Sequence, residues 1–181
     1  EYLKAGCDIV KTNTFGANSI KMEDSGYTAK ELIEKAVSIA KQAVNENGHG
    51  LVAMDIGPTG KLLRPLGDLE FDGAYEAFKE MAMVGEQAGA DVALIETMSD
   101  THEVKAAVLA VKENTKLPVF VTMTFDENAK LLTGGDIPAA VALLEGLGVD
   151  GIGFNCGLGP TQMKAFMKEL TACCSTPIIV N

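Results

Sequence analysis

The sequence predicts an α/β fold: a parallel (β/α) barrel of the TIM type, incomplete, with about six of eight strands present and the first and last missing. Two observations predict it. Short apolar strands alternate with amphipathic helices along the 181 residues, and such alternation requires a parallel sheet covered by helices. All six strands also end in polar residues. A barrel mouth needs polar groups at every strand end, whereas an open sheet gathers its ligand contacts at one switch point.

One unit occurs three times. Ala5-Gly6-Cys7-Asp8, Ala88-Gly89-Ala90-Asp91 and Leu147-Gly148-Val149-Asp150 each lead into a short apolar strand. The Gly is suited to a left-handed helix C-cap, and the Asp then turns the chain. The wholly apolar strand is typical of one buried on both faces. Five positions after each Asp stands a polar residue, namely Asn13, Glu96 or Asn155.

The other elements follow from local signals. Three more apolar strands are expected at 51–55, 119–124 and 178–181. Thr28-x-x-Glu31 is a capping box that opens a helix to about Asn45, and Asp100-x-x-Glu103 opens another that ends near Asn114. A helix is expected from about 74 to 87, one begins at Asp136 and the last begins at Pro160.

Composition excludes several classes of partner. The formal net charge is −10 and no run of Lys or Arg could follow a phosphate backbone, so we expect no nucleic acid partner. No stretch approaches the ~20 apolar residues of a membrane span, so we expect no membrane association. The four cysteines predict free thiols or metal ligands in a reducing compartment, hence a cytoplasmic protein. The chain starts without Met and stops in an apolar run, so residues 1–181 are interpreted as a partial barrel domain.

Five segments at strand ends carry a family resemblance. They are Asp8-Ile9-Val10-Lys11-Thr12-Asn13-Thr14-Phe15-Gly16-Ala17-Asn18, Asp55-Ile56-Gly57-Pro58-Thr59-Gly60, Ile95-Glu96-Thr97-Met98-Ser99-Asp100, Thr122-Met123-Thr124-Phe125-Asp126-Glu127 and Gly153-Phe154-Asn155-Cys156-Gly157-Leu158-Gly159-Pro160. In this order they resemble the homocysteine S-methyltransferase family, and most closely the homocysteine-binding domain of its cobalamin-dependent methionine synthase branch.

The resemblance implies a zinc enzyme that methylates the thiol of homocysteine to give methionine. In that family three cysteines hold zinc: one follows an Asn at a strand end, as Cys156 does here, and two lie in a Gly-Gly-Cys-Cys turn that this sequence does not reach. The open zinc position takes the homocysteine sulfur. Methylcobalamin, bound by another domain, is the implied donor, and the implied partners are the cobalamin- and folate-binding domains of the same protein.

The resemblance also assigns residues. Glu96 is expected to bind the amino group of homocysteine, and Asn13, Asn155 and Asp55 are expected to line the pocket. Cys173 and Cys174 are adjacent, as in the zinc turn. They end a helix and precede a strand, however, so we expect them at the opposite end of the barrel, away from any metal. The long segment from Ile56 to about Gly73 is interpreted as a lid or docking surface.

Alternatives remain open. The donor could be betaine or S-methylmethionine, and the isolated piece could be an inactive truncated barrel. A more remote alternative is a barrel enzyme for a phosphorylated metabolite, because the turn at 157–160 leads into a helix N-terminus, which binds anions. Aldolase-type chemistry would need a lysine at a strand end, and Lys11 is the only lysine in such a strand.

Overall fold

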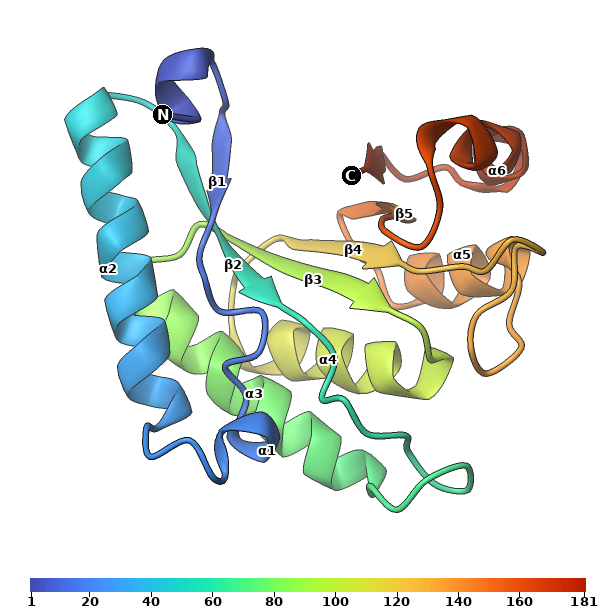
Figure 1. Cartoon of the computed structure of the whole chain (residues 1–181), viewed down its shortest axis with the longest axis horizontal. Coiled ribbons are helices and arrows are strands. Elements are labelled where there is room, and N and C mark those ends of the chain that lie inside the picture. Colours follow the sequence, from blue (N-terminus) through green and yellow to red (C-terminus); the bar gives the residue numbers. More distant parts are fainter.

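The computed structural model describes all 181 residues, and it confirms the predicted architecture of a curled, incomplete barrel. Six strands form one parallel sheet in chain order. They are β1 (Ile9–Lys11), β2 (Leu51–Ile56), β3 (Val92–Met98), β4 (Val119–Met123), β5 (Gly151–Phe154) and β6 (Ile178–Val180). In Figure 1 the helices form an arc outside the sheet, and the two termini face each other across its open side.

The helices cover the outer face. They are α1 (Ser19–Met22), α2 (Ala29–Asn47), α3 (Phe71–Gln87), α4 (Thr101–Asn114), α5 (Ile137–Gly146) and α6 (Pro160–Cys173), preceded by a short 3-10 helix at Leu3–Ala5. The Thr28–Glu31 capping box is present as predicted. At α4 the prediction was only half right. Asp100 caps the helix by accepting a hydrogen bond from the backbone N–H of His102, but Glu103 turns away to Thr59.

The repeated unit has a physical explanation. Its glycine is left-handed each time, with φ of 101° at Gly6, 100° at Gly89 and 71° at Gly148. The Asp of the second and third units anchors the preceding strand. Asp91 accepts a hydrogen bond from the N–H of Val52 at 2.7 Å, and Asp150 accepts one from Val119. The unit therefore ends a helix and fixes the start of the neighbouring strand.

Alternation along each strand separates two faces. Outward side chains such as Met54, Ile95 and Val121 are buried under the helices in a single cluster of 38 residues. Helix α3 packs closely on β2 at Gly85, because a Cβ at this position would lie 1.8 Å from Met54 Sδ. The inward side chains face the barrel interior and include the polar residues of the candidate site.

The segment between β2 and α3 is packed rather than loose. Leu63 is 3 % exposed, and Thr59 donates hydrogen bonds to the buried Glu103 carboxylate from both its backbone N–H, at 2.7 Å, and its hydroxyl. Two leucines of the segment, Leu62 and Leu66, are exposed. A lid or docking role for this segment stays a prediction.

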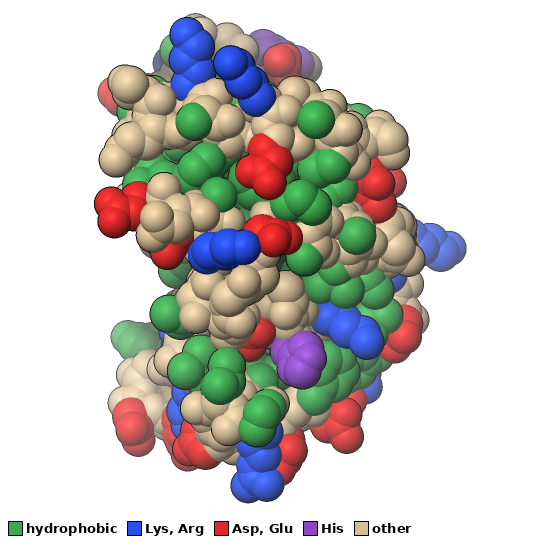
Figure 2. Space-filling view, turned by 90° about the vertical axis from the view of Figure 1, so that its right-hand side faces the viewer, with side chains coloured by type: hydrophobic (Ala, Val, Ile, Leu, Met, Phe, Trp, Pro, Cys, Tyr) green, Lys and Arg blue, Asp and Glu red, His purple; other side chains and the backbone are tan.

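On the face seen in Figure 2, Lys and Arg side chains lie singly or in pairs among acidic ones rather than in a stripe. No helix has the length and apolar character needed to cross a membrane.

Candidate active site at the mouth of the half-barrel

Three neighbouring strands bring charged side chains into the barrel interior. Lys11 ends β1, Asp55 lies near the end of β2, and Glu96 lies near the end of β3. Their strand ends share one edge of the parallel sheet. Below them is a cavity of about 350 Å³ lined by Ile9, Lys11, Ala53, Leu94, Glu96, Phe120, Thr122, Ile179 and Asn181.

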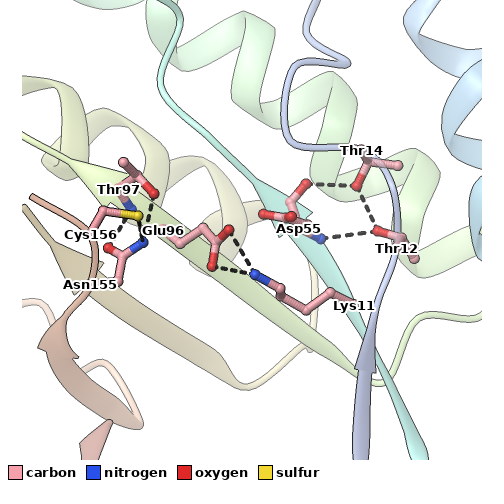
Figure 3. A network of polar contacts seen from close by, with 8 residues as sticks. All are labelled: Lys11, Thr12, Thr14, Asp55, Glu96, Thr97, Asn155 and Cys156. Atoms are coloured by element: carbon pink, nitrogen blue, oxygen red, sulfur yellow. Dashed lines mark hydrogen bonds and ion pairs between the residues drawn. The ribbon is translucent and has the colours of Figure 1, made fainter. Parts of the chain in front are cut away.

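An ion pair joins β1 to β3. Lys11 Nζ donates to both carboxylate oxygens of Glu96 at 2.9 Å (Figure 3). Ala53 is the register partner of Lys11 on the intervening β2, and its small side chain leaves room for the lysine stem to cross. Burial acts to lower the pKa of Lys11, but the hydrogen bond and charge of Glu96, helped by the charge of Asp55, outweigh it. The pKa is therefore raised from 10.5, and the ammonium stays charged.

Asp55 is a buried carboxyl without a countercharge of its own. Burial and, next, the negative charge of Glu96 raise the pKa of Asp55 from 3.8 to about 7. Its backbone is fixed from β1, because Thr14 Oγ1 donates to Asp55 O at 2.7 Å and Asp55 N–H donates to Thr12 Oγ1 at 3.1 Å. Asp55 Oδ1 and Thr122 Oγ1 are buried with no hydrogen-bond partner. Buried polar atoms are normally paired, so these two have capacity for a ligand.

On the other side of Glu96, a side-chain network joins β3 to the turn after β5. Asn155 Oδ1 accepts from the backbone N–H of Thr97 at 3.1 Å, and Asn155 Nδ2 donates to Thr97 Oγ1 at 2.7 Å. The same amide donates to Cys156 Sγ at 3.3 Å, and Cys156 is exposed. Thr97 and Cys156 have φ of 64° and 56°, a conformation that is costly for side chains with a Cβ and most of all for a β-branched one. Asn155 therefore links two residues with strained backbones, Thr97 within β3 and Cys156 in the turn after β5.

The structure brings most of the predicted residues to one edge but not all of them. Glu96 and Asp55 face the interior, and Asn155 and Cys156 lie beside them (Figure 3). Asn13 does not join them: it is exposed and lines a separate groove between β1 and α2. β1 ends at Lys11, so the alternation that would direct Asn13 inward stops two residues short.

Cys173 and Cys174 lie at the end of α6, before β6, and so at the opposite edge of the parallel sheet from Cys156. Partial burial raises the pKa of both thiols, with Glu169 adding to the effect at Cys173 and Glu145 at Cys174. A raised pKa disfavours the thiolate form that binds metals.

Two site residues carry roles that the sequence did not assign. The sequence offers Lys11 only as the lysine of an aldolase-type alternative, and its protonated, paired state is the opposite of what a Schiff-base lysine needs. Lys11 lies two residues before Asn13, so strand alternation would place both on the same face. This spacing could have predicted that Lys11 points into the barrel interior. The sequence indicates Thr97 only as a polar residue at a strand end, and no sequence pattern predicts its left-handed backbone.

The mouth of the half-barrel offers one sulfur donor for a metal, Cys156. Cys156 fits as one sulfur ligand, since its thiol is exposed at the mouth and oriented by Asn155. No group of three His, Cys, Asp or Glu side chains that could hold a metal ion exists in these 181 residues. A three-cysteine site would therefore need two ligands from elsewhere in the protein.

These features define a (β/α)-barrel protein with its site at the C-terminal mouth of the strands. The sequence profile of homocysteine S-methyltransferase matches residues 1–181. The chain therefore belongs to the homocysteine S-methyltransferase family.

Relatives support this assignment. Methionine synthase of Mycobacterium leprae is 35 % identical over 190 residues, and that of Mycobacterium tuberculosis is 34 % identical. Both matches cover 99 % of this chain but only 16 % of the relative, so the chain spans about a sixth of their length. The metallated crystal structure of homocysteine methyltransferase MmuM from Escherichia coli superposes with a TM-score of 0.86 over 99 % of this chain and 68 % of that one. At 24 % identity this likeness supports the fold alone.

Proposed function

We propose that this chain is the homocysteine-binding part of a zinc-dependent methyltransferase that methylates the homocysteine thiol to give methionine. The observation that carries the proposal is the pairing of a buried carboxylate with an exposed thiol at one barrel mouth. Glu96 and Cys156 are linked through Thr97 and Asn155 (Figure 3). An amino acid thiol needs both features, a carboxylate for its ammonium and a metal-ligand sulfur near its own.

Glu96 is suited to the ammonium because its carboxylate already holds a cation. It pairs with Lys11 Nζ through both oxygens, and its side chain is only 8 % exposed. A charged carboxylate in such a place is stabilised by a cation that donates hydrogen bonds to it. The ammonium of a substrate supplies the same group. Asp55 lies on the same face and adds a negative charge only above its raised pKa of about 7.

Cys156 supplies one of three thiolates for zinc, with the other two from a part of the protein outside these residues. Zinc with an open fourth position binds the substrate sulfur and favours its thiolate form. The role of this chain is to fix the direction of one ligand. Asn155 does so by donating to Cys156 Sγ while anchored to Thr97 on β3. Outer partners of this kind orient metal ligands.

Methylcobalamin is the proposed methyl donor, presented by another domain of the same protein, with a folate-binding domain as a further partner. The curated relatives support this because both are named methionine synthase and extend far beyond the matched part. The proposal places the protein in the cytoplasm, where thiols stay reduced.

The test compares donors and metal content in the intact protein that contains this chain. Methyl transfer to homocysteine should be supported by methylcobalamin, and not by betaine or S-methylmethionine. Cys156→Ala should abolish both bound zinc and transfer, while Cys174→Ala, at the opposite edge of the sheet, should keep both. Full zinc and full activity in Cys156→Ala would contradict the proposal, and transfer from betaine alone would replace the donor.

A further inference from the structure

Lys11 is the one cation lining the interior cavity, and the methyl transfer itself gives it no task. Its Nζ lies 2.9 Å from both oxygens of Glu96, the position in which a substrate ammonium would bind. The Lys11 side chain is 40 % exposed, whereas that of Glu96 is 8 % exposed. The acid is therefore fixed in the wall, and the ammonium of Lys11 lies on the open side of the pair.

A purely structural role explains this arrangement poorly. Ion pairs with an exposed member contribute little to stability, because the charge is screened and a long side chain must be held in place. Glu96 is the only residue that accepts a hydrogen bond from Lys11 Nζ. Lys11 is thus held in place mainly by the charge of Glu96, and it can move when another cation takes that carboxylate.

An α-amino acid carries an ammonium and a carboxylate on the same carbon. A site that recognises it needs opposite charges a few ångströms apart, and Lys11 with Glu96 is such a pair (Figure 3). The nearby Glu96 carboxylate is negative and repels a substrate carboxylate. Without Lys11 the interior would attract an amine but reject the amino acid.

We propose that Lys11 is the residue that recognises the α-carboxylate of the substrate. The inference rests on the proposed homocysteine site. In the free protein Lys11 fills the ammonium position and neutralises Glu96. When the amino acid enters, its ammonium replaces Lys11 Nζ on Glu96, and the released lysine pairs with the adjacent carboxylate. The exchange replaces one ion pair by two, and Glu96 is never left as an uncompensated buried charge.

The test combines substitutions with truncated ligands in the intact, zinc-loaded protein. Calorimetry would measure binding of homocysteine, of 3-aminopropane-1-thiol, which lacks the carboxylate, and of 4-mercaptobutanoate, which lacks the ammonium. Lys11→Met should weaken homocysteine about 10-fold or more, the usual effect of a lost charge-assisted hydrogen bond. It should leave the aminothiol unchanged or tighter, because Glu96 is then free. Lys11→Arg should restore most of the affinity, and Lys130→Met, on an exposed lysine, should change nothing.

The outcomes separate this inference from the proposed function. An equal loss for homocysteine and for the aminothiol, or tighter homocysteine binding in Lys11→Met, would overturn the carboxylate role while leaving the homocysteine site intact. In the unmodified protein, an aminothiol that binds as tightly as homocysteine would overturn it without any variant. If none of the three thiols binds the unmodified protein, the proposed function fails and this inference fails with it.

Discussion

Asn155 holds Thr97 from across the sheet through two side-chain hydrogen bonds, between residues 58 positions apart in sequence. Thr97 and Cys156, the two residues that the Asn155 side chain contacts, both have a left-handed backbone. The Asn155 side chain maintains this strain. Its amide bonds to the backbone N–H and the hydroxyl of Thr97 on β3, and it also donates to Cys156 Sγ in its own turn. The thiol at the mouth is thus oriented by the preceding residue, Asn155, which is itself anchored to Thr97 on β3.

Removing this amide should therefore affect the metal site without removing a ligand. In Asn155→Ala the backbone N–H and the hydroxyl of Thr97 lose their partner, at a cost of about 1–3 kcal/mol in the free energy of unfolding. Zinc affinity in the intact protein should fall about 10- to 100-fold, the usual effect of losing an outer partner of a metal ligand. Asn155→Asp keeps the acceptor for Thr97 N–H and should lose less stability. Competition with a chelator measures the first effect, and unchanged zinc affinity in Asn155→Ala would contradict it.

Asp55 should make the fold less stable as the pH rises. Its pKa is raised to about 7 in the folded state, so the folded protein holds this proton more tightly than the unfolded chain does. The stability linked to Asp55 is complete below about pH 4 and is lost as the pH rises toward 7. Between pH 5 and pH 8, Asp55→Asn should gain about 1–3 kcal/mol relative to the unmodified protein, given ~1.4 kcal/mol per pKa unit and some screening.

Urea titrations at the two pH values would measure this difference. Asp126→Asn is a suitable control, because hydrogen bonds from the backbone N–H groups of Lys130 and Asn128 lower the pKa of that exposed carboxyl. The contribution of Asp126 to the free energy of unfolding changes only below about pH 4. The difference in stability between Asp126→Asn and the unmodified protein should therefore stay constant from pH 5 to pH 8. A flat difference for Asp55→Asn as well would show that Asp55 is not a buried, destabilising charge.

Gly153 fixes how closely β5 and β6 approach. A Cβ at this position would lie 1.6 Å from the carbonyl oxygen of Ile179, which is backbone and cannot move aside without breaking the ladder. Gly153→Ala should therefore cost several kcal/mol and release β6. Gly146→Ala in α5 meets no atom within 4 Å and should be neutral or gain up to about 1 kcal/mol. Thermal unfolding separates the two, and equal melting temperatures would contradict this account of β5–β6 packing.

The sequence predicted the fold well because its strongest signals are local. The Gly-x-Asp units, the capping box at Thr28 and the apolar strands each depend on neighbouring residues, and each is present in the structure. The site was predicted less completely because it depends on side chains reaching across strands. Spacing suggested a second capping box for Glu103, yet a partner 44 positions away takes that carboxylate. Asn13 was expected to line the pocket, but it lines a separate groove, whereas Lys11 crosses β2 to reach Glu96.

The roles of Asn13, Asp55, Glu96, Asn155 and Cys156 toward substrate and metal stay predictions. The role of Glu96 can be tested most sharply. Glu96→Gln should leave zinc bound, because it removes no ligand and is separated from Cys156 by Thr97 and Asn155. It should weaken homocysteine by about 1.5–3 kcal/mol, because a neutral amide cannot replace a charge-assisted hydrogen bond to the ammonium. Glu103→Gln is a matched control, since it is equally buried but bonds to Thr59 outside the cavity.

The most direct measurement is therefore homocysteine binding by calorimetry, with zinc content determined on the same samples of the intact protein. The account predicts stoichiometric zinc in the unmodified protein, in Glu96→Gln and in Glu103→Gln, with homocysteine weakened about 10-fold or more in Glu96→Gln alone. Unchanged homocysteine affinity in Glu96→Gln would contradict the central claim that this buried carboxylate binds the substrate.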